Sequence, residues 1–317
     1  MSYRGRFAPS PTGRLHLGSA ATALFAAAAA RRAGGRWLLR VEDLDSDRVV
    51  PGAEHEQLND LEYLGLTPDE GPTSGGPTAP YRQSERRPLY EAALEALSDR
   101  GLTYYCDCSR ADIQRAASAP HAGDEGPLYP GTCRSNGMRP RSFKRPPAVR
   151  LRIPDSASQV RYEDSVVGTV CSPTAGLGDF VLRRGDGVFS YQFAVVVDDL
   201  AMGITEVVRG RDLMPSAPRQ ALLAELLGGV APAYCHVPML TDASGDRLAK
   251  RTPRATVSEH RERGIAGVDV LRVLANAYAQ VVSPSMDVDV LGALATVFDP
   301  KRFPDHDVPL SDLRWPS

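Results

Sequence analysis

The sequence of 317 residues lacks several features that would place it in a broad class at once. No apolar run reaches the length of a membrane span, because the longest, residues 20–30, is short and rich in alanine. The N-terminus carries no hydrophobic signal core, which predicts a cytoplasmic protein. With 37 basic and 39 acidic side chains the formal net charge is −2. No overall positive field attracts nucleic acid, so such a partner must bind a local patch.

Cysteine is scarce as well. Five cysteines, three of them clustered, argue against a disulfide scaffold and leave metal binding open. Cys106, Cys108 and Cys133 form the cluster, and three thiolates need a fourth ligand to complete a tetrahedral zinc site. Ordinary coordination chemistry nominates His121, while the alternative is three buried free cysteines. Cys171 and one further isolated cysteine, at position 235, are expected in the core.

The stretch around which the chain is organised is Arg6–Ser19, with the sequence RFAPSPTGRLHLGS. A short strand ending at Phe7 and Ala8 is expected to pass through a proline- and glycine-rich turn into a helix over residues 18–32. The N-terminus of such a helix offers unpaired N–H groups and a positive dipole end, which suit phosphate. His16 precedes this helix and could reach the phosphates. The alternative is an ordinary strand-to-helix turn with a surface histidine.

The PSPTG-x-LH-x-G pattern in this stretch resembles the signature of the glutamyl- and glutaminyl-tRNA synthetases, class I enzymes with a Rossmann catalytic domain. Residues 16–19, HLGS, correspond to the family's HIGH tetrapeptide, with Ser19 in place of the last histidine. The resemblance implies an α/β fold, in which a Rossmann-type catalytic domain carries a mixed α+β, zinc-bearing insert and a short helical C-terminal tail. The implied division is residues 1–80 for the first half of the Rossmann domain, 81–190 for the acceptor-binding insert with the zinc site, 191–256 for the second half and 257–317 for the tail.

Two further segments place polar residues at the carboxyl ends of expected strands, where open parallel sheets bind ligands. Glu42 follows a strand expected over residues 37–41 and could face a substrate amino group, or it could be a surface acid. Arg209 ends a strand expected over residues 204–209. A buried arginine there could pair with a substrate carboxylate in a bidentate manner, or form an ion pair with Asp212 or Asp199 instead.

The family resemblance gives these positions a role. The runs RVEDLD, YQFAVVVDD and VRGRDL are similar to family motifs that contact the amino-acid substrate. An arginine at position 209 that pairs with the side-chain carboxylate would explain a preference for glutamate over glutamine. The implied glutamate-binding residues are Arg6, Phe7, Ala8, Pro9, Ser10, Glu42, Tyr191 and Arg209.

A third cluster, residues 245–251 with the sequence GDRLAKR, would be a surface loop if taken alone. It resembles the family's KMSKS loop, with RLAKR at the motif itself. Lys250 matches the second lysine, whose ammonium would stabilise charge on the transferring phosphates. Arg247 and Ala249 depart from the pattern. The implied catalytic and ATP-binding residues are His16, Gly18 and Lys250, and Mg²⁺ is expected to accompany ATP.

The resemblance also bears on the cysteines and on the C-terminal region. The C-x-C and Y-P-G-x-C spacing is similar to one branch of the family and implies Tyr129 as the fourth ligand of one structural zinc, with Cys106, Cys108 and Cys133; His121 is the substitute. After residue 256 we expect one helix, over 269–282, and a proline-bearing tail. That length is too short for the anticodon-binding domain of full-length glutamyl-tRNA synthetases. Arginines between 134 and 150 could contact RNA or form a solvated loop.

The resemblance therefore implies an enzyme of the ligase type that acts in two steps: ATP-dependent activation of L-glutamate as glutamyl-adenylate, then transfer to the queuosine base at the wobble position of tRNA(Asp). We expect it to act as a monomer. Three alternatives stay open. They are a truncated glutamyl-tRNA synthetase that charges the 3′ end of tRNA(Glu), a glutaminyl enzyme, and a non-catalytic RNA-binding paralogue.

Overall fold

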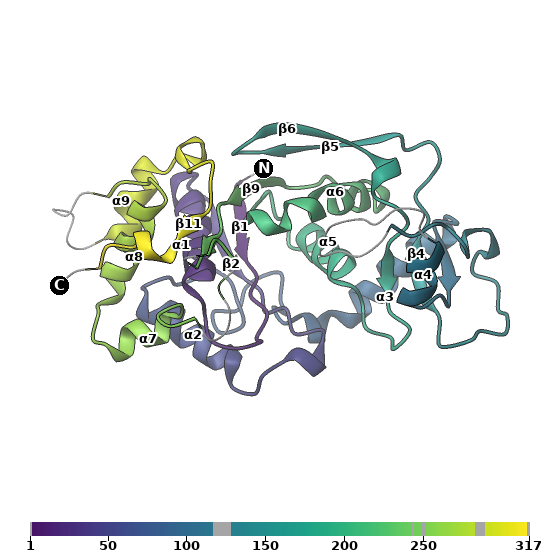
Figure 1. Cartoon of the computed structure of the whole chain (residues 1–317), viewed down its shortest axis with the longest axis horizontal. Coiled ribbons are helices and arrows are strands. Elements are labelled where there is room, and N and C mark those ends of the chain that lie inside the picture. The colour runs from purple at the N-terminus through teal and green to yellow at the C-terminus, as the bar shows by residue number, and fades with distance from the viewer. Residues whose placement is uncertain are drawn as a thin grey trace.

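The structure is a computed structural model that describes residues 2–116, 128–242, 244–246, 248, 252–282 and 289–315. A six-stranded sheet forms its centre (Figure 1). Its strands are β1 (Arg4–Phe7), β2 (Arg36–Leu39), β5 (Gln159–Asp164), β6 (Gly168–Pro173), β8 (Glu206–Gly210) and β9 (Ala233–Val237). In the order β2-β1-β8-β9-β5-β6, the first five strands run parallel and β6 runs antiparallel to β5. The parallel strands therefore share one carboxyl edge.

Nine α-helices are assigned within the described residues. They are α1 (Leu17–Arg32), α2 (Ala53–Tyr63), α3 (Arg87–Asp99), α4 (Arg110–Ala116), α5 (Tyr191–Ala201), α6 (Ala217–Leu226), α7 (Val257–Glu262), α8 (Gly267–Ala277) and α9 (Val290–Val297). None of the described helices is both long and apolar enough to span a membrane.

Helices cover the sheet on both faces. On one side α1 packs against α8 and α9, and on the other α5 packs against α6 and α3, as Figure 1 shows. The alanines of α1 are buried almost without exception, and their small side chains let the helix lie close to β1 and β8. Two apolar clusters result, one on each face, and together they form the core.

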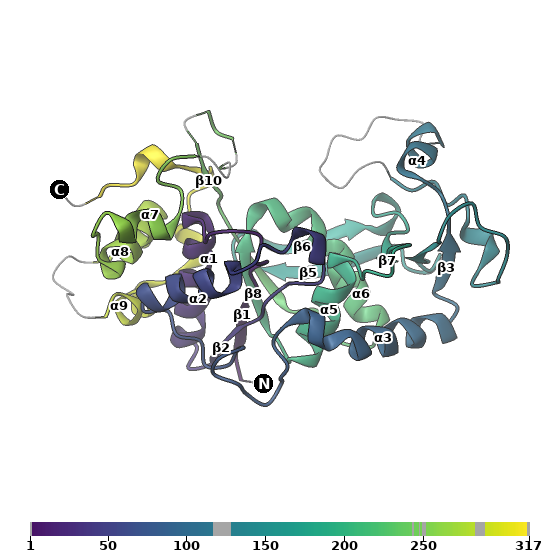
Figure 2. The same cartoon turned by 90° about the horizontal axis from the view of Figure 1, so that it is seen from below.

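The insert forms a separate layer at the far end of the molecule from α7–α9 (Figure 2). It contains a three-stranded antiparallel sheet of β3 (Thr103–Cys106), β4 (Ala148–Leu151) and β7 (Val181–Arg183). The β5–β6 hairpin also falls within residues 81–190, yet it is hydrogen-bonded to β9 of the central sheet. A short parallel pair, β10 (Leu240–Thr241) and β11 (Val308–Pro309), lies beside α1.

Several expectations about elements are confirmed and others are corrected. The helix expected over residues 18–32 and the strand expected over 204–209 are present within two residues of their predicted ends. The region after residue 256 holds α7, α8 and α9 rather than one helix. Cys235 is buried as expected, but Cys171 is exposed, because it lies on the solvent side of the edge strand β6.

Candidate active site

The predicted substrate residues gather at the shared carboxyl edge of the parallel strands. Arg6 lies near the end of β1, and Glu42 follows the end of β2. Arg209 lies near the end of β8, in register with His236 of β9. Parallel strands bring their carboxyl ends together, so segments far apart in the sequence meet here. This edge is the candidate active site.

A buried ionic network occupies the β1–β2 side of the edge. Arg6 donates from Nε and Nη2 to the two oxygens of Asp199, over 3.3 and 3.2 Å. Arg40 donates from Nη1 to Asp199 Oδ1 over 2.7 Å and from Nη2 to Glu42 Oε1 over 3.1 Å. Asp199 of α5 thus bridges both arginines, which ties the first half of the sheet to a helix from the second half.

The charges of this network act against the cost of burial. Burial opposes ionisation of Asp199, but Arg6 and Arg40 outweigh it and lower the pKa of that carboxyl below its ordinary value. For Glu42 the balance is reversed, and burial raises its pKa although Arg40 and Arg6 act in the other direction. Glu42 is therefore a largely buried carboxylate whose charge is incompletely compensated, and a substrate ammonium group could supply the missing positive charge.

A neighbouring acid, Asp198, fixes the network from behind. It accepts hydrogen bonds from Arg86 Nε at 2.6 Å, Gln83 Nε2 at 2.7 Å and the Tyr90 hydroxyl at 2.9 Å. Arg40 Nε lies 3.6 Å from the same carboxylate. The motifs alone indicated no role for Arg40 or Asp198. Both residues lie within motifs, RVEDLD and VVVDD, and this position was the only sign of their importance in the sequence.

Arg209 is almost fully buried, and its guanidinium group is held by neutral groups. It donates from Nε to His236 Nε2 over 3.1 Å, from Nη1 to Gln220 Oε1 over 2.6 Å and from Nη2 to the Leu213 carbonyl over 3.2 Å. The ring of Tyr234 lies 4.7 Å from its central carbon. Among the described residues no carboxylate forms an ion pair with Arg209, so the expected alternatives, Asp212 and Asp199, are not its partners. Two of its five N–H groups are left for a ligand.

The remaining predicted glutamate-binding residues lie near the ionic network and Arg209. Tyr191 begins α5 and is 39% exposed, so its side chain can contact a ligand. Phe7 is buried at the end of β1, and the following residues 8–10 become progressively more exposed. Glu42, beyond the end of β2, and Arg209, near the end of β8, thus lie at the same carboxyl edge of the sheet.

The histidine turn lies at the N-terminus of α1. His16 is the N-cap residue of this helix, and the first backbone N–H with a helical partner is that of Ala20, which donates to the His16 carbonyl over 2.9 Å. The N–H groups of Gly18 and Ser19 precede it and have no partner within the helix. This geometry matches the strand-to-helix turn that the sequence predicts, and phosphate binding at this end stays a prediction.

The chain on either side of residues 245–251, the basic loop, is anchored at this histidine turn. Leu17 N–H donates to the Ala255 carbonyl over 2.8 Å, and Val257 N–H donates to the Leu15 carbonyl over 2.9 Å. On the other side of the loop, the Leu240 side chain lies against Gly18. The residues that flank segment 241–254 on both sides therefore contact the histidine turn. Arg247, Ala249 and Lys250 themselves lie outside the described residues.

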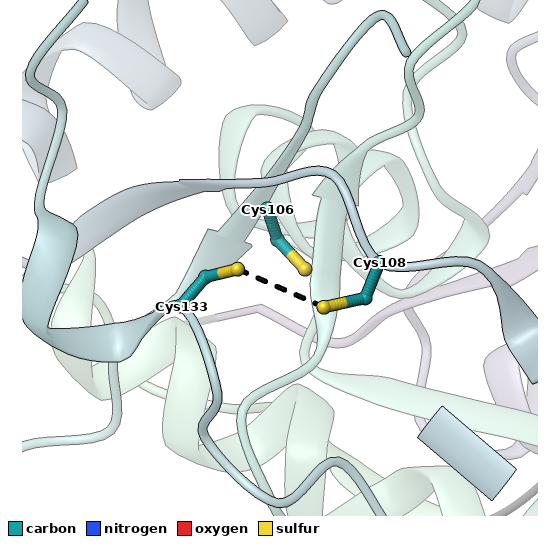
Figure 3. A group of neighbouring side chains, drawn as sticks. All are labelled: Cys106, Cys108 and Cys133. Carbon is teal, nitrogen blue, oxygen red and sulfur yellow. Dashed lines mark hydrogen bonds between the residues drawn. The ribbon is translucent and has the colours of Figure 1, made fainter. Parts of the chain in front are cut away.

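The three clustered cysteines converge at the end of β3 (Figure 3). Their sulfur atoms lie within 4.8 Å of one another, and Cys108 Sγ is 3.7 Å from Cys133 Sγ. The Tyr129 hydroxyl is 3.3 Å from Cys106 Sγ and 3.9 Å from Cys108 Sγ. Tetrahedral zinc with bonds to sulfur of about 2.3 Å separates its ligands by roughly 3.8 Å, so these four groups have the right spacing. His121, the substitute ligand, lies outside the described residues.

Arginines between residues 134 and 150 form ion pairs within the insert. Arg134 pairs with Asp155 and Asp179, and Arg141 pairs with Asp107, the acid between the first two cysteines. These arginines are less available to RNA than their number in the sequence suggests.

Beside them lies an open pocket with a volume of about 360 Å³. It is lined by Tyr105, Pro140, Phe143, Pro147, Arg183, Arg184, Gly185 and Gly187.

Comparison with known proteins gives a consistent result. Residues 2–281 match the family model described as tRNA synthetases class I (E and Q), catalytic domain. A glutamyl-Q tRNA(Asp) synthetase of Nitratidesulfovibrio vulgaris is 46% identical over 306 residues, which cover 94% of this chain and 94% of that protein. Glutamate–tRNA ligase 1 of Halorhodospira halophila is 41% identical over 318 residues, which cover 96% of this chain and 66% of that protein. The crystal structure of a glutamate-tRNA synthetase from Elizabethkingia anophelis superposes with a TM-score of 0.80 at 29% identity, covering 99% of this chain and 69% of that one.

Proposed function

Since the chain belongs to the class I tRNA synthetases of the E and Q type, we propose that it activates L-glutamate with ATP and transfers it to the queuosine base of tRNA(Asp). One observation carries the first half of this proposal. Within the described part of the chain, Arg209 is buried without a carboxylate partner, and at the same edge of the sheet Glu42 is a largely buried carboxylate whose pKa is raised. An amino acid with an acidic side chain supplies the missing charge to both.

The charges explain why glutamate is the best occupant. The ammonium group would bind at Glu42, and the side-chain carboxylate would accept the two remaining N–H groups of Arg209. Glutamine offers a neutral amide in place of that carboxylate, which leaves the buried guanidinium without a countercharge. Tyr191 and residues 6–10 would enclose the substrate between these two groups.

The first reaction forms an adenylate. An oxygen of the glutamate α-carboxylate attacks the α-phosphorus of ATP, the bond to the β-phosphate oxygen breaks, and pyrophosphate leaves. His16 and the Gly18 end of α1 would bind phosphate oxygens, and Lys250 would offset the charge that develops as the bond breaks. Mg²⁺ would accompany ATP and help to neutralise its phosphates. The hydrogen bonds that anchor residues 255–257 at the histidine turn support this arrangement.

In the second step an acceptor hydroxyl attacks the carbonyl carbon of the adenylate, the bond to phosphate breaks, and AMP leaves. For queuosine the acceptor is a hydroxyl of its cyclopentene diol. The support for this acceptor is that several relatives, which match nearly the whole chain at 44–46% identity, are named glutamyl-Q tRNA(Asp) synthetases. The pocket beside Tyr105, Phe143 and Arg183 offers aromatic and cationic groups of the kind that contact RNA.

We also propose that Cys106, Cys108, Tyr129 and Cys133 hold one zinc ion with no open position. Such a site would be structural, and a bound ion would join the end of β3 to the segment around residue 130. Burial raises the pKa of Cys108 to about 12 and also raises that of Tyr129, so a bound cation would have to displace both protons to use these atoms as anionic donors.

ATP–pyrophosphate exchange tests the first step without any RNA. We expect exchange that depends on L-glutamate and is much weaker with L-glutamine. Arg209→Gln should abolish the preference between the two, and Lys250→Ala should lower kcat roughly 100-fold or more. The exposed Arg161→Gln and Lys144→Ala are matched controls and should behave like the wild type. A purified, folded protein without glutamate-dependent exchange would favour the non-catalytic alternative.

A further inference from the structure

Behind Arg209 lies a buried chain of polar groups that the proposed reaction does not itself use. Arg209 Nε donates to His236 Nε2, and the other ring nitrogen, His236 Nδ1, contacts Asp164 Oδ2. The three residues come from the adjacent parallel strands β8, β9 and β5, and all three are at most 3% exposed. Buried polar contacts of this kind fix side-chain orientations strongly, because breaking one leaves a group without a partner.

The arginine determines which tautomer the histidine adopts. An arginine Nε–H can only donate, so His236 Nε2 must be the acceptor and must carry no proton. The ring proton then lies on Nδ1 and is donated to Asp164. Burial, together with the charge of Arg209, lowers the pKa of His236 although Asp164 opposes this, which agrees with a neutral ring. The directions of the hydrogen bonds from Arg209 to His236 and from His236 to Asp164 are thereby set.

Asp164 is itself held in one orientation. Its Oδ1 accepts hydrogen bonds from the backbone N–H groups of Val166, at 2.8 Å, and Val167, at 3.1 Å. Only Oδ2 is left to face the histidine. We propose that Asp164 and His236 are positioning residues that hold the Arg209 guanidinium in the orientation needed to bind the glutamate side-chain carboxylate. This inference rests on the proposed role of Arg209 in binding glutamate.

Asp164→Asn gives a sharp test because the structure dictates how the amide must turn. The two valine N–H groups require an oxygen at the Oδ1 position, so the amide NH₂ must face His236 Nδ1. Nδ1 then becomes the acceptor, and the ring proton moves to Nε2, where it meets the Nε–H of Arg209. Two donors face each other, and the arginine must move although the substitution changes no volume.

Two substitutions of His236 test its two hydrogen bonds separately, the one to Arg209 and the one to Asp164. A glutamine side chain can bring its amide oxygen to the place of Nε2 and accept from Arg209. An asparagine side chain reaches only the place of Nδ1, where it can donate to Asp164. If the role is to position Arg209, His236→Gln should bind glutamate better than His236→Asn, even if both lose the same thermal stability.

The measurements are the KM values for glutamate and for ATP in ATP–pyrophosphate exchange without RNA. We expect Asp164→Asn to raise the KM for glutamate roughly 10- to 100-fold, as for a lost hydrogen bond to a charged group, and to leave the KM for ATP nearly unchanged. Asp179→Asn is the matched control. Asp179 is also buried and accepts a backbone N–H, from Ile153, but it lies in the insert.

A measurement on the wild-type protein reads the tautomer of His236 directly. ¹⁵N NMR of histidine-labelled protein should show His236, assigned by loss of its signals in His236→Gln, as the neutral tautomer with the proton on Nδ1. A proton on Nε2, or an unchanged KM for glutamate in folded Asp164→Asn, would overturn the inference while leaving the proposed function intact. If the wild type shows no glutamate-dependent exchange, the proposed function fails, and the inference fails with it.

Discussion

Glu42 is held where burial and two arginines act in opposite directions on its carboxyl group, and burial prevails. We expect Glu42→Gln to raise the KM for glutamate roughly 10- to 100-fold, because the substrate ammonium loses a charged partner, and to change the KM for ATP little. The raised pKa of Glu42 means that the wild type should lose glutamate affinity as the pH falls toward that pKa, whereas Glu42→Gln should not. Glu163→Gln, at an exposed carboxylate, is the control. Parallel pH profiles for wild type and Glu42→Gln would contradict this role.

Asp199 contributes to stability as well as to the site, because it bridges Arg6 and Arg40. Asp199→Asn should lower the free energy of unfolding by about 3–5 kcal/mol at pH 7, measured by denaturant titration, since it leaves two buried cations undercompensated. The pKa of Asp199 is lowered in the folded protein, so its stabilisation is present above the unfolded value of about 3.9 and is lost as the pH falls through the folded pKa. The difference between variant and wild type should therefore shrink in acid. A difference independent of pH would argue against an ionic role.

At the level of single residues, the sequence predicted where the proposed site residues lie better than it predicted their partners. Arg6, Glu42 and Arg209 lie at the strand edge that the motifs indicated. Their partners could not be read from the sequence, because Arg40 and Asp199 are 159 residues apart and meet only through the sheet order. The same holds for His236 and Asp164.

Among the elements, the short helix α7 has a role beyond its size, since it begins where the chain leaves the basic loop. The Thr256 N–H and hydroxyl both donate to Glu259 at the start of this helix, over 3.0 and 2.8 Å. Thr256→Ala should lower the free energy of unfolding by about 1 kcal/mol and reduce kcat of exchange more than it changes the KM for glutamate. Thr169→Ala also removes a hydroxyl that donates to a carboxylate, but on an exposed hairpin, and should leave kcat unchanged. Equal effects of both variants on kcat would show that the loop end does not matter.

The insert provides a second test at this scale. We expect about one zinc per chain in the purified protein, and Tyr129→Phe should lose metal more readily because it removes one donor atom while keeping the ring. Metal content by mass spectrometry and thermal unfolding are the readouts, and Tyr105→Phe, on β3 next to Cys106, is the control. Chelation should lower the melting temperature and should affect RNA labelling more than ATP–pyrophosphate exchange. Full stability of metal-free protein would contradict a structural zinc site.

The sequence predicted long, regular elements well and short ones poorly. The alanine-rich α1 has strong helix formers along 16 residues, so its existence and ends were clear. The helices α7 and α9 have six and eight residues and depend on packing rather than on propensity, which is why the sequence pointed to a single helix in that region. The exposed side of β6 was missed for a related reason, since an edge strand is recognised only once its neighbours are known.

On the scale of the whole molecule, the fold explains how so many distant segments serve one reaction. Arg6, Arg40 and Glu42 meet Asp199 at the carboxyl edge of the sheet, where Arg209 also lies. Residues 255–257 connect the end of the basic loop to the histidine turn. The net charge of −2 provides no general attraction to RNA, so acceptor choice must come from local contacts. The acceptor is therefore the part of the proposal that needs the most direct test.

That test is the labelling of tRNA(Asp) with radioactive glutamate in the presence of ATP, using otherwise identical tRNA with and without queuosine. Digestion of the product to single nucleotides then identifies the one that carries the label. The account predicts label only on queuosine-containing tRNA(Asp), at the wobble nucleotide. Equal labelling of both tRNAs, or label at the 3′-terminal nucleotide, would contradict it.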